Sequence, residues 1–325
     1  MTVKRRQYKV RQKRRSKSLL WLLLGLVGIG AAAAVLSARR HPLFEDWEPK
    51  RPSGPPEPPD DLEAAPDGEA LWIAGPDGNL YIRDGGEGDL PILFIHSLAG
   101  NGGQWALQLD HLRRQRRAVA LDLRGHGESD PADDGDYSIT ALAADVAAAA
   151  DQLGLRRFVL AGHSLGALVA IEYASRHPER VAALLLVDPN GDQSRVPREQ
   201  IESFLAPLRQ DPLKELEWYF RQLVTGGDTD AARWVLEDLR LTDENAIVGA
   251  LESASTYAPL PALERYQGPK LSVISGLNNL PYSLHKVVPD LPTRFMPGTG
   301  HWLMMDRPEQ FNQILDEFLD EVEGR

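Results

Sequence analysis

A serine flanked by glycines is the first feature of this sequence that could do chemistry. Residues 162–166 read Gly-His-Ser-Leu-Gly, which places Ser164 at the centre of a G-x-S-x-G pattern. An apolar run, residues 158–161, precedes the pattern, and a helical pattern begins at Leu165. A sharp turn from strand to helix exposes the serine, and the N-terminus of the helix favours developing negative charge. We therefore predict that Ser164 is a nucleophile.

A serine hydroxyl is a poor nucleophile until a base takes its proton, and His301 is the candidate base. Of the eight histidines, it alone follows the last apolar run of the chain within a glycine-rich loop, residues 298–302. The sequence contains no H-E-x-x-H pair, no comparable cluster of ligands and no phosphate loop. We therefore expect acid–base and nucleophilic chemistry, with no metal and no cofactor.

Several apolar runs supply the elements that would position these residues. Residues 91–95, 118–121, 158–161 and 181–187 are almost wholly apolar, which is typical of strands buried on both faces of a parallel sheet. Helical patterns lie between them, and two later strands precede a last helix at about residues 308–322. The sequence thus predicts an α/β fold with a mostly parallel central sheet flanked by helices.

This alternation of strands and helices stops between residues 190 and 263. The segment has helical patterns but no convincing strand, and it is too long for a plain loop in a compact domain. We interpret it as a helical lid inserted after the sixth strand of the sheet.

On these motifs the chain resembles the α/β-hydrolase superfamily from about Ala70 to the C-terminus. Residues 95–98 look like the segment that forms the oxyanion hole, and residues 122–129 resemble the family's D-x-R-G-x-G-x-S turn. Residues 298–302, followed by Arg-Pro-Glu at 307–309, look like the loop of the catalytic histidine and the final helix. The resemblance implies an α/β-hydrolase fold, with His301 as the base and the backbone N–H groups of Leu98 and Leu165 as the oxyanion hole. Ser97 departs from the glycine that is usual in this segment.

The third catalytic residue does not follow the family pattern. Most relatives have an aspartate after the seventh strand in a G-x-x-D arrangement, whereas residues 276–279 here read Gly-Leu-Asn-Asn. One interpretation moves the acid to Asp188, after the sixth strand, where haloalkane dehalogenases and pancreatic-type lipases carry theirs. In a second, the amide oxygen of Asn279 orients His301, and in a third the enzyme is weakened or inactive. We take Asp188 as the acid and keep Asn279 as the alternative.

The N-terminal part of the chain has a different composition. The net charge is -11, yet residues 1–18 contain nine basic residues and residues 1–40 no acidic one. Residues 19–38 are uncharged and would form a helix of about 30 Å, which matches the thickness of a bilayer.

We expect a basic cytoplasmic N-terminus at residues 1–18, a transmembrane anchor at 19–38, a proline-rich linker at 39–69 and a domain at 70–325 outside the cytoplasm. A cleaved signal peptide is the alternative for the apolar helix. We expect the basic residues to contact anionic lipid rather than nucleic acid.

A serine at the nucleophile position argues against haloalkane dehalogenases and epoxide hydrolases, which carry an aspartate there. The sequence therefore predicts a membrane-anchored carboxylic-ester hydrolase that acts on a small ester-like substrate through a Ser-His-acid triad and an acyl-enzyme. The alternatives are a carbon–carbon bond hydrolase and a non-catalytic ligand-binding or sensor protein of the same fold. The fold does not fix the substrate, because it hosts many chemistries.

Overall fold

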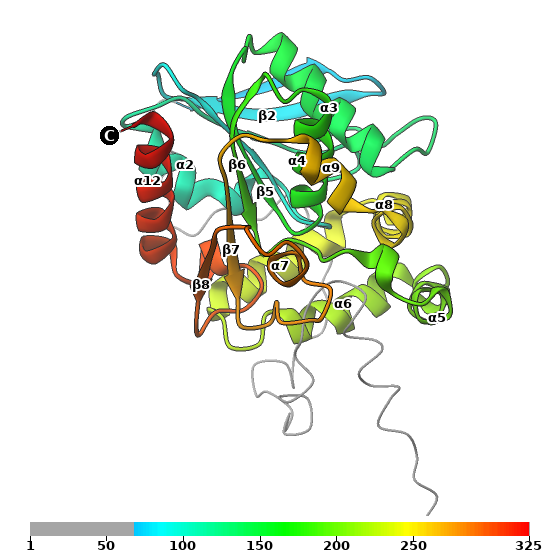
Figure 1. Ribbon diagram of the computed structural model, residues 1–325. Helices are drawn as coiled ribbons and strands as arrows, with labels where there is room; N and C mark the ends of the chain where they lie inside the picture. The colour runs from blue at the N-terminus through cyan, green and yellow to red at the C-terminus, as the bar shows by residue number, and fades with distance from the viewer. Residues whose placement is uncertain (1–67, 325) are drawn as a thin grey trace, which may run out of the picture.

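The computed structural model describes residues 68–324, which form one sheet covered by helices on both faces (Figure 1). The order of the eight strands is β1-β2-β4-β3-β5-β6-β7-β8. Strand β2 pairs antiparallel with β1 and β4, and the strands from β4 to β8 are parallel. The strands are β1 (Gly68–Ala74), β2 (Asn79–Gly85), β3 (Ile92–Ile95), β4 (Ala118–Leu121), β5 (Phe158–His163), β6 (Val181–Val187), β7 (Lys270–Ser275) and β8 (Thr293–Met296). This arrangement confirms the predicted α/β-hydrolase fold.

The four central strands are the ones predicted from wholly apolar runs, and every residue in them is buried. Helices α2 (Ala106–Arg113) and α12 (Pro308–Glu323) cover one face of the sheet, and α3 (Ile139–Gln152), α4 (Leu165–Arg176) and α9 (Pro259–Arg265) cover the other (Figure 1). Short helices complete the connections: η2 (Gly102–Trp105), η3 (Gln193–Arg195), α10 (Leu284–Val287) and α11 (Leu303–Asp306).

Five α-helices occupy the chain between β6 and β7, and we call residues 198–265 the helical insertion. Its helices are α5 (Arg198–Leu208), α6 (Pro212–Leu223), α7 (Thr229–Leu241), α8 (Glu244–Thr256) and α9. Helices α6, α7 and α8 each begin after an aspartate whose carboxylate accepts a backbone N–H of the first turn, which satisfies donors that a helix start leaves free. Helices α5 to α8 lie together beyond one end of the sheet (Figure 1). That they act as a lid stays a prediction.

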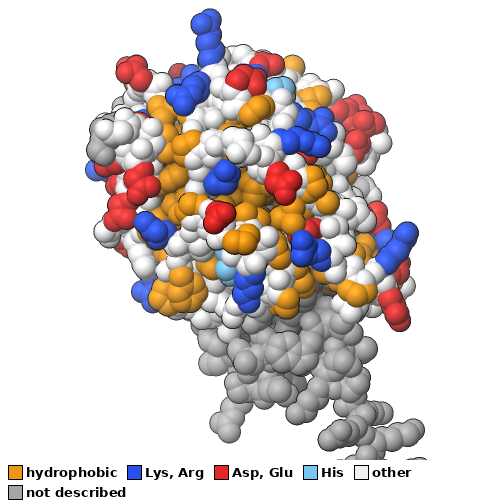
Figure 2. All heavy atoms as spheres, viewed as in Figure 1, with side chains coloured by type: hydrophobic (Ala, Val, Ile, Leu, Met, Phe, Trp, Pro, Cys, Tyr) orange, Lys and Arg blue, Asp and Glu red, His pale blue; other side chains and the backbone are white. Residues whose placement is uncertain are grey.

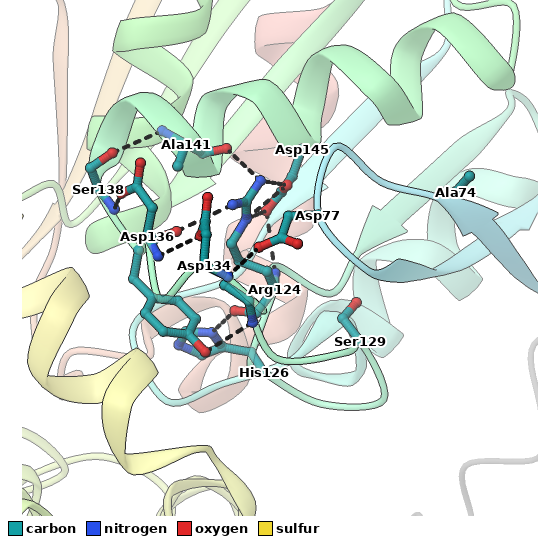
Figure 3. Close-up of polar contacts among 12 residues, drawn as sticks. Ala74, Asp77, Arg124, His126, Ser129, Asp134, Asp136, Ser138, Ala141 and Asp145 are labelled. Carbon is teal, nitrogen blue, oxygen red and sulfur yellow. Dashed lines mark hydrogen bonds and ion pairs between the residues drawn. The ribbon is translucent and has the colours of Figure 1, made fainter.

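The turn at residues 122–129 is held by buried polar contacts. Arg124 faces Asp145 of α3 (Figure 3), with Nη2 2.6 Å from Oδ1, and both side chains are buried. The Arg124 guanidinium also donates to the backbone oxygens of Asp136 and Ala141. Burial raises the pKa of Asp145, and the ion pair with Arg124 opposes that rise. Arg124 and Asp145 therefore tie the chain after β4 to α3.

The surface offers no single-sign patch on the face seen in Figure 2, where basic and acidic side chains are interspersed with apolar ones. Among the described residues, no helix combines the length and apolarity that crossing a membrane needs. The predicted basic segment 1–18, anchor 19–38 and most of linker 39–69 lie outside those residues. They stay predictions.

Candidate active site

Ser164 lies at a tight turn between β5 and α4. Its backbone has φ 53° and ψ -112°, a conformation that L-residues rarely adopt and that is common at functional sites. A Cβ on Gly162 would lie 2.2 Å from the backbone oxygen of Gly166, and a Cβ on Gly166 would lie 2.4 Å from that of His96. The two glycines of the motif are therefore required by the close approach of β5, α4 and the end of β3. The close packing of these elements places Ser164 at the edge of the sheet where the parallel strands end.

His301 and Asp188 form a buried pair beside this turn. His301 Nδ1 lies 2.7 Å from Asp188 Oδ2, and the two side chains are 2% and 0% exposed. Asp188 also accepts the Ser275 N–H at 2.9 Å and the Ser275 hydroxyl at 2.8 Å. Because the carboxylate only accepts, His301 carries its proton on Nδ1 and leaves Nε2 free to act as a base.

The position of Asp188 follows from the topology of the sheet. Strands β6 and β7 are parallel neighbours, with Val187 opposite Val273, so both strands end at the same edge. Asp188 has φ 40° and donates its N–H to Val273 O at 2.7 Å, which turns its side chain towards the end of β7. An acid from the end of β6 thereby lies against His301 in the place where an acid after β7 is expected.

Asn279, the alternative third member, lies elsewhere. Its side chain is exposed, and its backbone oxygen accepts from Lys286 Nζ at 3.0 Å. The neighbouring Asn278 is buried and donates to the backbone oxygen of Pro189 at 3.0 Å. The structure therefore brings Asp188, and not Asn279, against His301.

The two backbone N–H groups predicted to form the oxyanion hole are available. Leu165 is the first residue of α4, where N–H groups have no partner within the helix. In residues 68–324, neither its N–H nor that of Leu98 donates to another protein group, although both residues are buried. Ser97 directs its hydroxyl to Leu98 O and to Gln104 Oε1, each at 3.3 Å. The Ser97 hydroxyl thus contacts Gln104 of η2.

One contact of the nucleophile is absent from the sequence-based expectations. Ser164 Oγ donates to Asn190 Oδ1 at 3.2 Å, and Asn190 is 3% exposed. Within the described residues this is the only hydrogen bond of the hydroxyl, so its proton points to Asn190 and not to His301. Catalytic hydrogen bonds often form only when substrate binds. Asn190 is therefore a resting-state partner of Ser164.

The backbone of His301 is held from two sides. His163 Nε2 donates to the His301 backbone oxygen at 3.0 Å, and the His301 N–H donates to Leu223 O, at the end of α6, at 2.9 Å. Burial lowers the pKa of His163 well below its ordinary value, so this ring is neutral. The backbone of His301 is thus hydrogen-bonded both to the sheet, through His163, and to the helical insertion, through Leu223.

Sequence reasoning missed Ser275 and Asn190. Ser275 ends the strand that carries the usual acid, and Asn190 follows Asp188 by two residues, so adjacency was the only signal available. Within residues 68–324, no group of three or more His, Cys, Asp or Glu side chains is arranged to hold a metal ion.

Comparison with known proteins places this geometry in context. The family described as the alpha/beta hydrolase fold matches residues 91–308. The dihydrolipoyllysine-residue acetyltransferase component of the acetoin cleaving system of Pseudomonas putida is 31% identical over 252 residues. That match covers 74% of this chain and 66% of the relative, so the chain spans just under two thirds of that protein.

Two further similarities concern hydrolases. The N-formylmaleamate deformylase of Pseudomonas putida is 28% identical over 263 residues, which cover 74% of this chain and 92% of the deformylase. The crystal structure of a membrane phospholipase A, described as a bacterial virulence factor, superposes with a TM-score of 0.64 at 26% identity. That superposition covers 79% of this chain and 87% of the phospholipase chain.

Proposed function

This chain belongs to the α/β-hydrolase family, and within that enzyme class we propose that it is a serine hydrolase that cleaves carboxylic esters through an acyl-enzyme. One observation carries the proposal: the buried hydrogen bond of 2.7 Å between Asp188 and His301, at the edge of the sheet that presents Ser164. A serine flanked by such a pair is suited to acyl transfer.

The proposed reaction uses only groups of this chain and water. His301 Nε2 takes the proton of Ser164 Oγ, which attacks the ester carbonyl, and Asp188 stabilises the resulting imidazolium. The N–H groups of Leu98 and Leu165 stabilise the oxyanion of the tetrahedral intermediate. Collapse of the intermediate expels the alcohol, which receives the proton from His301, and leaves an acyl-Ser164 ester. Water, activated by the same histidine, then releases the acid.

The choice of an ester rests on chemistry and on the relatives. A serine is suited to acyl transfer, and the solved structures similar to this chain include a membrane phospholipase A, whereas one sequence relative is an N-formylmaleamate deformylase. An alkoxide leaves far more readily than an unprotonated amide anion, so ester cleavage needs less help from a general acid than amide cleavage. A non-catalytic binding protein is the alternative, and it predicts no reaction of Ser164 with an electrophile.

We further propose that residues 19–38 anchor the chain in a membrane, with the catalytic domain outside the cytoplasm and the helical insertion as a lid. The uncharged stretch of bilayer length after a basic segment supports the anchor. The Leu223 contact to His301 supports the lid, because moving α6 would release the loop of the base. Alkaline carbonate washing of membranes tests the anchor: extraction of the full chain into the wash would refute it.

A fluorophosphonate probe tests the ester hydrolase. We expect the full chain to be labelled at one residue and to hydrolyse p-nitrophenyl esters, and we expect Ser164→Ala to abolish both reactions. Ser129→Ala, which changes a serine of the turn after β4, is the matched control for labelling. If the wild-type chain is not labelled under conditions in which a known serine hydrolase is, the protein is not an active serine hydrolase.

A further inference from the structure

A buried carboxylate of the helical insertion lies against η2 and the residue that precedes it. Asp238 of α7 is 2% exposed. Its Oδ1 accepts from Asn101 Nδ2 at 2.8 Å, and its Oδ2 accepts from Gln104 Nε2 at 2.9 Å. More than 130 residues separate Asp238 from these partners in the chain. The proposed mechanism leaves this acid unused.

The orientation of both amides is fixed by their other contacts. Asn101 Oδ1 accepts the Gly103 N–H at 2.8 Å, so the Nδ2 group must face Asp238. Gln104 Oε1 accepts from Trp302 Nε1 at 3.3 Å. An indole N–H can only donate, so Gln104 must turn its Nε2 group to Asp238. Asp238 therefore faces two donors that cannot be reversed, and only its ionised form accepts from both at full strength.

These contacts join three parts of the candidate site. Asn101 and Gln104 directly follow the segment that holds Leu98, and the Ser97 hydroxyl lies 3.3 Å from Gln104 Oε1. Trp302, bonded to the same oxygen, is the residue after His301. We propose that Asp238 is a positioning residue. While the helical insertion contacts the rest of the domain, Asp238 fixes the oxyanion segment and the loop of the base relative to each other. This inference rests on the proposed function.

The environment of Asp238 gives this contact a dependence on pH. Burial raises its pKa to about 7, opposed by the bonds from Gln104 and Asn101. The charged groups that face it are Asp122, which raises the pKa, and Arg83, which lowers it and is itself paired with Asp122 at 2.7 Å. When the pH falls through about 7, the Asp238 carboxylate gains a proton and loses one of its two acceptor oxygens. The side-chain amides of Asn101 and Gln104 cannot turn to compensate, because their oxygens are held by other donors. We therefore expect residues 97–105 to be held less firmly below neutral pH.

Stability should respond with the opposite sign. The pKa of Asp238 is higher in the folded than in the unfolded chain, so the folded state binds this proton more tightly. The contribution of Asp238 to stability therefore falls as pH rises from about 4 to about 7, while the network is completed. A residue that only stabilised the fold would not make activity and stability change in opposite directions over this range.

Asp238→Asn tests the proposal, with Asp230→Asn as control on the same helix, where Asp230 is exposed and paired with Arg233. The NH2 group of the new asparagine must face the NH2 group of either Asn101 or Gln104, so one of the two hydrogen bonds is lost. We expect kcat for a p-nitrophenyl ester to fall about 10-fold at pH 8.5, with little change in KM, and by less than about 2-fold at pH 5.5. A ratio of wild type to variant that does not change with pH would overturn the proposal.

Hydrogen exchange gives a readout that needs no turnover. At pH 8 we expect the backbone amides of residues 97–105 to exchange faster in Asp238→Asn than in wild type, and at wild-type rates in Asp230→Asn. Unchanged exchange in this segment would reject the positioning role, even if the protein hydrolysed no ester and the proposed function had failed. If Asp238→Asn does not fold, Asn101→Ser replaces it in both measurements, since serine keeps the cap on Gly103 and loses the amide donor.

Discussion

Replacing Asp188 by asparagine should abolish nearly all activity by changing the tautomer of His301. Three donors face the carboxylate: His301 Nδ1–H and the N–H and hydroxyl of Ser275. The backbone N–H of Ser275 cannot turn, so the single amide oxygen of the variant stays with it. The amide NH2 then takes the place of Oδ2 and faces His301 Nδ1, which must accept. The ring consequently carries its proton on Nε2 and cannot accept the proton of Ser164.

The expected loss is large because the wrong tautomer removes the base without moving it. An Asp-to-Asn change of this kind lowers kcat by about 10⁴-fold, or about 5 kcal/mol of transition-state stabilisation at about 1.4 kcal/mol per tenfold change. KM should change little, because the carboxylate is 0% exposed and does not meet substrate. Labelling by a fluorophosphonate should slow by a similar factor, since that reaction needs the same base.

Turnover of p-nitrophenyl acetate or butyrate, with the protein concentration taken from absorbance at 280 nm, measures this loss. Asn279→Ala is the matched control, and its kcat should stay within about 2-fold of wild type because the Asn279 side chain is exposed. Circular dichroism establishes that both variants fold. If Asp188→Asn keeps a tenth or more of the activity while Asn279→Ala loses most of it, the assignment of the acid is wrong.

Three further changes test the surroundings of the site. Ser275→Ala removes a hydroxyl that donates to Asp188, and should lower kcat/KM for the same esters about 10- to 100-fold; an unchanged value would show that the backbone N–H suffices. Asn190→Ala removes the resting partner of the Ser164 hydroxyl, and should speed fluorophosphonate labelling about 5-fold, whereas slower labelling would assign Asn190 to substrate binding. Asp145→Ala leaves the buried Arg124 unpaired, at a cost of about 3 to 5 kcal/mol, and should lower the midpoint of thermal unfolding by about 6 to 15 °C. A double variant that also replaces Arg124 by methionine should recover most of that loss, and no recovery would contradict the pairing.

The sheet and the tight turn at Ser164 could be predicted because local signals carry them. Wholly apolar runs specify strands that are buried on both faces, and this pattern identified β3 to β6. Ser164 has a distinctive neighbourhood in the sequence, since Gly162 and Gly166 are required by backbone contacts within a few ångströms. The absence of strand patterns likewise predicted helices between β6 and β7, although their role is untested.

The remaining features depend on which strand ends are neighbours. The sequence favours Asp188 as the partner of His301 but leaves Asn279 open as the alternative, and only the pairing of β6 with β7 brings Asp188 to Ser275. The contact between Asn101 and Asp238 spans 137 residues and follows no periodicity. Such pairings are set by how the helical insertion packs, and a single sequence carries no local signal for them.

The position of Asp188 beside His301 also has a mechanical consequence. The segment that follows it is pinned to the loop after β7: Asn278 donates to Pro189 O, and Asp192 donates its N–H to Tyr282 O at 2.9 Å. The helical insertion begins a few residues further on, at Arg198. The segment through which the chain enters the helical insertion is therefore fixed close to Asp188. If the helical insertion moves as the proposed lid, α6 and α7 would pivot about this fixed segment while the Asp188 carboxylate stayed in place.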